Sequence, residues 1–330
     1  MFQIVNVGNV TEPLEEILGT AKVSADLRGY SDDFLVTGKF RISLVKERVR
    51  TLSVREISSR YCPTKRDLYI QKGRNGPRRR QSRGSDSFER KAGILGEQFF
   101  QGLTDVTFRS STSYSDLKNE SDTYYNKFSK QNESEFDWLK QDSSLNHEIF
   151  VAQLRSGGRV ESTISRILSG LTDNDPLGVN DILSHQILNP NKMTGISAGS
   201  QPDFLITRLK MVGDVKSGEA IDVKHLLICA GYALAYENWK GEDINWGMIY
   251  LIKTKNSQRI GKYVSLPQIY IFPIDDDLRG FFIQRRNEAL QIVSRPRLPK
   301  KPSSMKDRRL YCRDCVYRKV CEEDGLEVPE

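Results

Sequence analysis

Two aspartates and a lysine stand at the ends of neighbouring apolar runs in the segment QPDFLITRLKMVGDVKSG. Asp203 opens the first run, and Asp214 and Lys216 close the second. If the runs pair as a β-hairpin, Asp203 and Asp214 come together, and strand alternation places Asp214 and Lys216 on one face. Such a set suits a hard divalent cation, Mg²⁺ or Mn²⁺, which can polarise a phosphodiester and acidify a bound water. Taken alone, the pattern is more typical of turn caps and surface ion pairs than of a metal site.

A second group of residues with metal-binding chemistry lies near the C-terminus. Cys312, Cys315 and Cys321 form a C-x2-C-x5-C pattern, and Cys62 stands much earlier, in RYCPTKRDLY. Four thiolates can complete a [4Fe–4S] cluster or a tetrahedral zinc site, and the spacing does not distinguish the two. The other interpretation is that the three later cysteines only pack in a small hydrophobic tail. Cys229, within an apolar run, is expected to be a buried free thiol.

The order of these motifs resembles that of a known nuclease family. Pro202-Asp203, ten intervening residues and Asp214-x-Lys216 resemble the PD-(D/E)xK signature, and GDVKSG resembles its RecB-type version. RecB-like nucleases with an iron–sulfur cluster place one cysteine before the core and C-x2-C-x5-C after it, as this chain does. Over most of its length, the chain therefore resembles the CRISPR-associated RecB-like iron–sulfur exonucleases, the Cas-four type, and among them the Csa-one branch.

This resemblance implies a fold, an activity and partners. The fold would be α/β, with a PD-(D/E)xK (RecB-like, restriction-endonuclease-like) nuclease core, an N-terminal helical region and a C-terminal iron–sulfur element. The activity would be metal-dependent cleavage of single-stranded DNA, typically from the 5′ end. It would serve CRISPR adaptation by processing spacer precursors alongside the CRISPR integrase proteins.

The resemblance also assigns roles to individual residues of this chain. Glu97, Asp203 and Asp214 would hold Mg²⁺ or Mn²⁺. Asp203, Asp214, Lys216 and Tyr232 would form the catalytic set, with Lys216 as the catalytic lysine and Tyr232 as a supporting residue. The ligands of the [4Fe–4S] cluster would be Cys62, Cys312, Cys315 and Cys321.

The chain departs from the family pattern at two positions. The family has a histidine where Glu97 stands, and His147 is a competing candidate for that metal ligand. Ile228 replaces the glutamine of the family's Gln-x-x-x-Tyr helix; His225 either substitutes for it or simply caps or packs against the sheet. Two alternatives remain open, and these departures favour the first. One is a non-catalytic iron–sulfur DNA-binding or scaffold subunit of the adaptation complex, and the other is a RecB-like DNA repair nuclease.

A basic stretch, QKGRNGPRRRQSRG, contains no acidic residue. Arg78, Arg79 and Arg80 could bind DNA phosphates in a sequence-independent and salt-sensitive way. The alternative is a solvated loop. The whole chain, with a formal charge of +7, permits an anionic partner without requiring one.

The elements that must position these residues follow from hydrophobic periodicity. Helices are expected over 85–103, which carries Glu97, within the polar insertion at about 110–146, and over 160–171. Strands are expected in DFLIT, KMVGDVK, WGMIYLIK and QIYIFPI, with helices in VKHLLICAGYALAYENW and DDLRGFFIQRRNEALQIV. The alternation predicts an α/β domain. Four regions are expected: 1–84 with the first cysteine and basic loop, 85–200 helical with the insertion, 201–294 as nuclease core, and 295–330 with the cysteine element.

Composition excludes several classes of protein. Hydrophobic residues make up 38% of the chain and charged residues 28%, which excludes a fibrous or wholly disordered protein. Three histidines are too few for a multi-histidine zinc enzyme. No apolar run is long enough to cross a bilayer, and no secretory signal is recognisable, so a cytoplasmic protein without membrane contact is expected.

Overall fold

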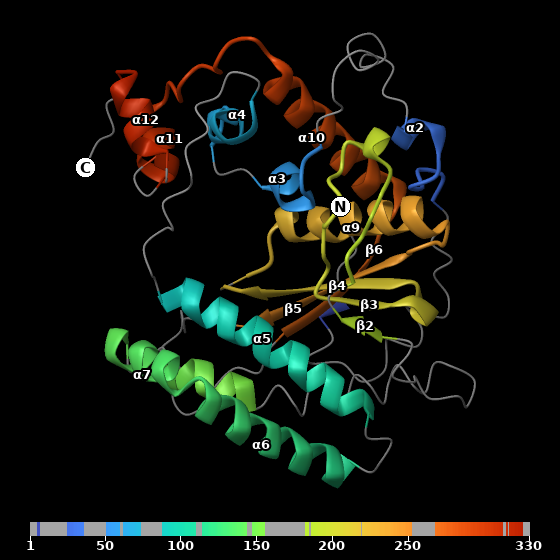
Figure 1. Cartoon of the computed structure of the whole chain (residues 1–330), viewed down its shortest axis with the longest axis vertical. Helices are drawn as coiled ribbons and strands as arrows, with labels where there is room; N and C mark the ends of the chain where they lie inside the picture. The colour runs from blue at the N-terminus through green and yellow to red at the C-terminus, as the bar shows by residue number, and fades with distance from the viewer. Residues whose placement is uncertain are drawn as a thin grey trace.

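A six-stranded mixed sheet forms the centre of the molecule in the computed structural model (Figure 1). The structure describes residues 5–6, 25–35, 51–59, 62–73, 88–109, 114–143, 147–155, 182–184, 186–218, 220–252, 268–312, 315 and 317–325. The strand order is β1-β6-β5-β4-β3-β2. The strands are β1 (Val5–Asn6), β2 (Ile182–Ser184), β3 (Phe204–Ile206), β4 (Met211–Ser217), β5 (Trp246–Ile252) and β6 (Gln268–Pro273).

Only β4 and β5 run parallel among the strand pairs that the structure describes. A parallel pair needs a crossover connection, and the helix α9 (Val223–Lys240) supplies it. The Asp222 side chain accepts a hydrogen bond from the Lys224 N–H at the start of α9, and Gly241 ends the helix in the left-handed conformation. The local sequence therefore fixes both ends of the crossover.

Helices cover both faces of the sheet (Figure 1). One face carries α5 (Phe88–Arg109), α6 (Tyr114–Gln131) and α7 (Glu133–Asp142). The other carries α9 and α10 (Asp276–Ser294), with α3 (Val54–Ser58) and α4 (Arg66–Lys72) packed beyond them. Side chains alternate along β4 and so contribute to the apolar cores on both faces of the sheet. Val212 packs with α9, whereas Met211 and Val215 pack with α5.

Shorter elements complete the description. They are α2 (Asp32–Leu35), the 3-10 turns η3 (Lys192–Thr194) and η4 (Thr207–Leu209), and the C-terminal pieces α11 (Met305–Asp307), η5 (Arg308–Cys312) and α12 (Arg318–Glu323). Within the described part of the chain, no helix is long and apolar enough to cross a membrane.

The expected α/β class and element pattern are confirmed where the structure describes them. The four expected strands are β3 to β6, and the polar insertion forms α6 and α7. Its aromatic side chains pack inward, with Tyr125 and Phe128 against Phe99 of α5. The expected helix over 160–171 and the arginines at 78–80 lie outside the described residues, and the four-region division remains a prediction.

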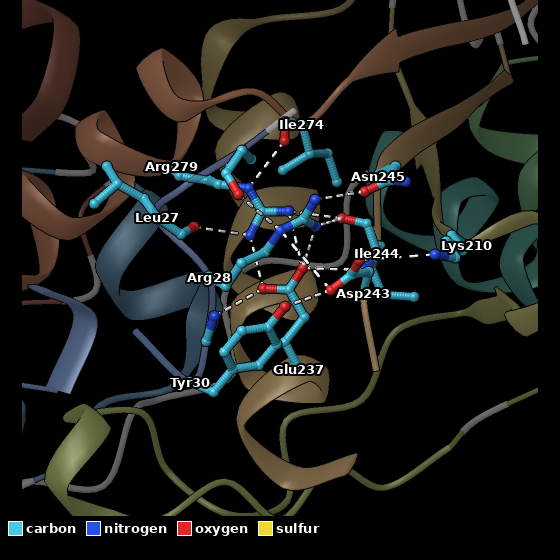
Figure 2. A network of polar contacts seen from close by, with 12 residues as sticks. Leu27, Arg28, Tyr30, Lys210, Glu237, Asp243, Ile244, Asn245, Ile274 and Arg279 are labelled. Carbon is cyan, nitrogen blue, oxygen red and sulfur yellow. Dashed lines mark hydrogen bonds and ion pairs between the residues drawn. The ribbon is translucent and has the colours of Figure 1, made fainter. Parts of the chain in front are cut away.

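A buried carboxylate ties the N-terminal segment to α9 and α10 (Figure 2). Glu237 of α9 is fully buried between Arg28 and Arg279, with nitrogen–oxygen distances of 2.9 and 2.7 Å. The backbone N–H groups of Gly29 and Ile244 also donate to it, at 2.8 and 3.0 Å. Every lone-pair direction of this carboxylate is therefore used, which is the condition for burying a charge.

We expect Glu237→Gln to lower the free energy of unfolding by about 3–5 kcal/mol, because two arginines would lose the charge they were buried against. Urea unfolding measures the change. Glu288→Gln is the matched control, since Glu288 lies half exposed, 3.8 Å from Arg285, and its loss should change stability by less than about 0.5 kcal/mol. Equal effects of the two substitutions would contradict a structural role for the Glu237 network.

Candidate functional site

The β3–β4 hairpin brings Asp203 and Asp214 together, as the sequence predicts. Phe204 pairs with Gly213 in the antiparallel register, so the residues one step further out, Asp203 and Asp214, face each other across the hairpin. The Val215 N–H donates a hydrogen bond of 2.5 Å to Oδ2 of Asp203. Both carboxylates are buried, Asp214 completely.

Lys216 pairs with Asp214 on the same face of β4. Its Nζ lies 2.5 Å from Oδ2 of Asp214 and also donates to the Val215 carbonyl at 3.0 Å. Oδ1 of Asp214 has no hydrogen-bond donor among the described residues. One lysine therefore offsets only part of the buried negative charge of the two aspartates.

Glu97 reaches the same place from the opposite layer of the fold. Two glycines let α5 lie close to the sheet: a Cβ at Gly93 would meet Oγ of Ser217 at 2.6 Å, and one at Gly96 would meet Cδ1 of Ile252 at 2.5 Å. The close approach places half-buried Glu97, one residue after Gly96, at the end of the hairpin. Close packing of α5 against the sheet therefore explains the two glycines in the Gly-x-x-Gly-Glu run.

A cavity of about 270 Å³ opens at this end of the sheet, where elements from both layers meet. It is lined by Ser53, Val54, Arg55, Glu97, Gly199, Ser200, Gln201, Asp203 and Tyr232. Sequence reasoning identified Glu97, Asp203 and Tyr232 but missed Arg55. No motif pointed to it, because α3 reaches the cavity only through tertiary packing.

The negative charges of the site interact strongly. Burial raises the pKa of Asp203 well above its usual range, and the charges of Asp214 and Glu97 raise it further. Burial, with Asp214 again contributing, also raises the pKa of Tyr232, so its hydroxyl stays protonated at neutral pH. The side chains that surround Asp203 therefore favour a positive partner.

A hard cation suits this donor set, because it would relieve the repulsion that raises the pKa of Asp203 and would provide a partner for Oδ1 of Asp214. The side chains are not in coordination geometry, however. In the ranges that the structure describes, no three His, Cys, Asp or Glu side chains converge closely enough to hold a metal ion.

Neither His147 nor His225 lines the cavity. His147 packs near Phe136 of α7, with ring centroids 6.2 Å apart, and is not among the residues that line the cavity. Nδ1 of His225 accepts a hydrogen bond from the Asp222 N–H at 3.1 Å, which completes the cap of α9. The capping interpretation of His225 agrees with this geometry, and Glu97 is the residue that lies beside Asp203.

The four predicted cluster cysteines lie in one patch. Cys312 and Cys321 are buried and Cys315 is half-buried in a small apolar cluster that includes Ile70 of α4. Cys62 is buried close enough for its charge to add to the effect of burial in raising the pKa of each of the other three. Burial raises the pKa of Cys315 to about 11, with smaller contributions from Cys321 and Cys62. The thiols are thus near neighbours, but they too fall short of metal-binding geometry in the described residues. Cys229 is fully buried in the core, as expected.

An arginine of α4 holds this patch together across the chain. Arg66 donates to the Pro299 carbonyl at 2.7 Å and pairs with the carboxylate of Asp324. Residues near Cys62 and residues near Cys321 are therefore fixed to each other by contacts that involve no cysteine.

Comparison with known proteins gives a family match over almost the whole chain. Residues 1–324 match the family described as CRISPR-associated exonuclease Csa1. No curated protein and no solved structure matches the chain.

We expect Asp203→Asn to raise the free energy of unfolding of the metal-free protein near pH 7 by about 1 kcal/mol or more. The folded-state pKa of Asp203 is raised, so its contribution to stability is greatest below about pH 4, the unfolded value. This contribution is lost as the pH rises through the folded value. Asparagine removes that loss and keeps an acceptor for the Val215 N–H.

Urea unfolding in EDTA at several pH values measures the effect. Asp277→Asn is the control, because Asp277 is exposed and should leave stability within about 0.5 kcal/mol. A less stable Asp203→Asn protein at neutral pH would contradict the buried-charge account of the site.

Proposed function

The chain belongs to the CRISPR-associated exonuclease Csa1 family, and on this premise we propose that it is a divalent-metal-dependent nuclease of single-stranded DNA. We propose further that it cuts from the 5′ end and processes spacer precursors beside the CRISPR integrase proteins. The mixed sheet and its hairpin would then be the core of a PD-(D/E)xK nuclease. The observation that carries the proposal is the pair of buried aspartates facing each other in the β3–β4 hairpin, with Lys216 on Asp214.

The carboxylates have the chemistry that this reaction needs. Glu97, Asp203 and Asp214 would hold Mg²⁺ or Mn²⁺, because carboxylate oxygens are hard donors. The bound cation would supply Lewis acidity for the phosphodiester and a more acidic water. The pairs already formed within the hairpin position the carboxylates: the Val215 N–H orients Asp203, and Lys216 orients Asp214.

Lys216 and Tyr232 would act on the reacting groups. The ammonium group of Lys216 can orient the attacking water and offset the charge that develops on the phosphate oxygens. Tyr232 lines the cavity with Asp203, and its raised pKa keeps its hydroxyl as a hydrogen-bond donor to phosphate. Tyr232 therefore needs no change of protonation state to bind the substrate.

The cysteine patch supports a second part of the proposal. Cys62, Cys312, Cys315 and Cys321 would ligate a [4Fe–4S] cluster, since the four thiols lie near one another beside a small apolar cluster. A cluster there would join α4 to the C-terminal element, which Arg66 already links. Arg78, Arg79 and Arg80, outside the described residues, would bind the DNA backbone.

We expect Asp214→Asn to lower the rate of single-strand cleavage in Mn²⁺ by several orders of magnitude, because the carboxylate that positions the cation is lost. DNA binding should persist or tighten slightly, since a negative charge is removed near the phosphate path. Cleavage of end-labelled strands and fluorescence anisotropy measure the two effects. Asp277→Asn, outside the cavity, is the control and should cut at the unmodified rate.

The same assay separates an enzyme from a scaffold. A protein that cuts nothing in Mg²⁺ or Mn²⁺ but binds DNA and the integrase would support the non-catalytic alternative. Ile228 and Glu97, which replace the family's glutamine and histidine, are the observations that favour that alternative.

We expect Cys321→Ser to remove the brown colour of anaerobically purified protein and to lower its stability, because one of four ligands is lost. Cys229→Ala is the matched control and should keep the colour, since Cys229 lies in the sheet core and bonds the Met248 carbonyl. Visible absorbance and iron analysis report the result. Colourless protein with stoichiometric zinc would refute the iron–sulfur assignment and retain the four-cysteine site.

A further inference from the structure

Arg55 is held at the mouth of the cavity by a short, well-anchored helix. Oγ of Ser53 accepts from the Glu56 N–H at 3.2 Å, and the Glu56 carboxylate accepts from the Ser53 N–H at 2.8 Å, which together form a capping box. Buried Val54 and Ile57 on either side fix the helix against the core. The position of Arg55 is therefore set by its neighbours, while its own side chain is exposed.

The helix is also fastened to the loop that forms another wall of the cavity. The Leu52 N–H donates to the Gly195 carbonyl at 3.0 Å, and the Ser197 N–H donates to the Leu52 carbonyl at 2.8 Å. Gly199, Ser200 and Gln201, which follow this bridge, line the cavity beside Asp203. Arg55 and the aspartates are thus parts of one connected frame.

The guanidinium group of Arg55 faces acidic groups without pairing with one. Among the described residues, no ion pair within 4 Å and no hydrogen bond involves its side chain. Burial acts to lower the pKa of Arg55, but the charges of Tyr232, Asp214, Glu97 and Asp203 outweigh it and raise the pKa. No described residue accepts a hydrogen bond from the five N–H donors of Arg55, which can therefore bind a ligand in the cavity.

We propose that Arg55 binds the phosphodiester group that is presented to Glu97, Asp203 and Asp214; this inference rests on the proposed nuclease function. Three carboxylates and one phosphodiester carry four negative charges. Lys216 and a divalent cation offset three of them, and Arg55 offsets the fourth. Two parallel N–H groups of a guanidinium, its fork, can also bond two phosphate oxygens at once. An ammonium group has no such planar pair of donors.

A double-mutant cycle on binding tests this pairing without relying on cleavage. One partner is changed by Arg55→Ala. The other is changed by a short single strand whose last three linkages at each end are uncharged methylphosphonates. Affinities are measured by fluorescence anisotropy in Ca²⁺, which supplies the divalent charge to oxygen ligands, and electrophoresis of the recovered strands confirms that none was cut.

For the all-phosphodiester strand, we expect Arg55→Ala to weaken binding about 10- to 100-fold, the range for a hydrogen bond to a charged group. For the methylphosphonate strand, the unmodified protein and Arg55→Ala should bind equally. Arg55→Lys should restore binding only in part, because it keeps the charge without the fork. Thermal unfolding of each variant confirms that the exposed substitution leaves the fold intact.

Arg295→Ala is the matched control, because Arg295 is exposed and lies outside the cavity. Its effect should be small and the same on both strands. An Arg55→Ala effect of equal size on both strands, or none on either, would overturn the inference. Failure of the unmodified protein to cut DNA in Mn²⁺ would refute the proposed function alone, since the binding cycle still reports whether Arg55 contacts the phosphate.

Discussion

The burial of two facing carboxylates is the constraint on which the rest of the site depends. Asp203 and Asp214 meet because the β3–β4 register places them opposite each other, and both are buried, Asp214 completely. Such a pair is stable only beside positive charge or donors, so Lys216 and the Val215 N–H lie against it at 2.5 Å. The glycines of α5 then admit Glu97, which adds a third negative charge. This accumulation of negative charge opposes stability, and the proposed cation would offset it.

A second buried charge serves stability instead. Glu237 is surrounded by two arginines and two backbone N–H groups, whereas Oδ1 of Asp214 has no donor within the described chain. Glu237 stands five residues after Tyr232 on α9, so the same network that fixes the N-terminal segment also fixes the helix that lines the cavity. Glu237, with a full set of donors, belongs to the structural framework. Asp214, with one oxygen lacking a donor among the residues described, belongs to the candidate site.

The helix α3 connects the two predicted metal regions of the chain. Arg55 and Ser53 line the cavity with Asp203, and they also line a neighbouring cavity of about 260 Å³ that includes Cys62. The cysteine patch in turn is linked to the C-terminal segment through Arg66. Anything that orders the patch therefore has a direct structural route to the position of Arg55. This gives a physical reason for a cysteine element to accompany this site.

The sequence by itself determined the hairpin and which of its charged side chains lie together. Two apolar runs separated by a turn predict the pairing, and strand alternation places Lys216 beside Asp214, because both depend only on local geometry. The sequence also predicted the helix that carries Glu97 and showed the spacing of the cysteines, because both are local patterns along the chain. Only the tertiary structure shows that Glu97, and not His147, lines the cavity with Asp203, since both occur in helices and only packing shows which helix reaches the sheet. It also revealed Arg55 and the Glu237 network, whose partners are distant along the chain. No local pattern records such contacts, because they arise only when separate layers of the fold close on one another.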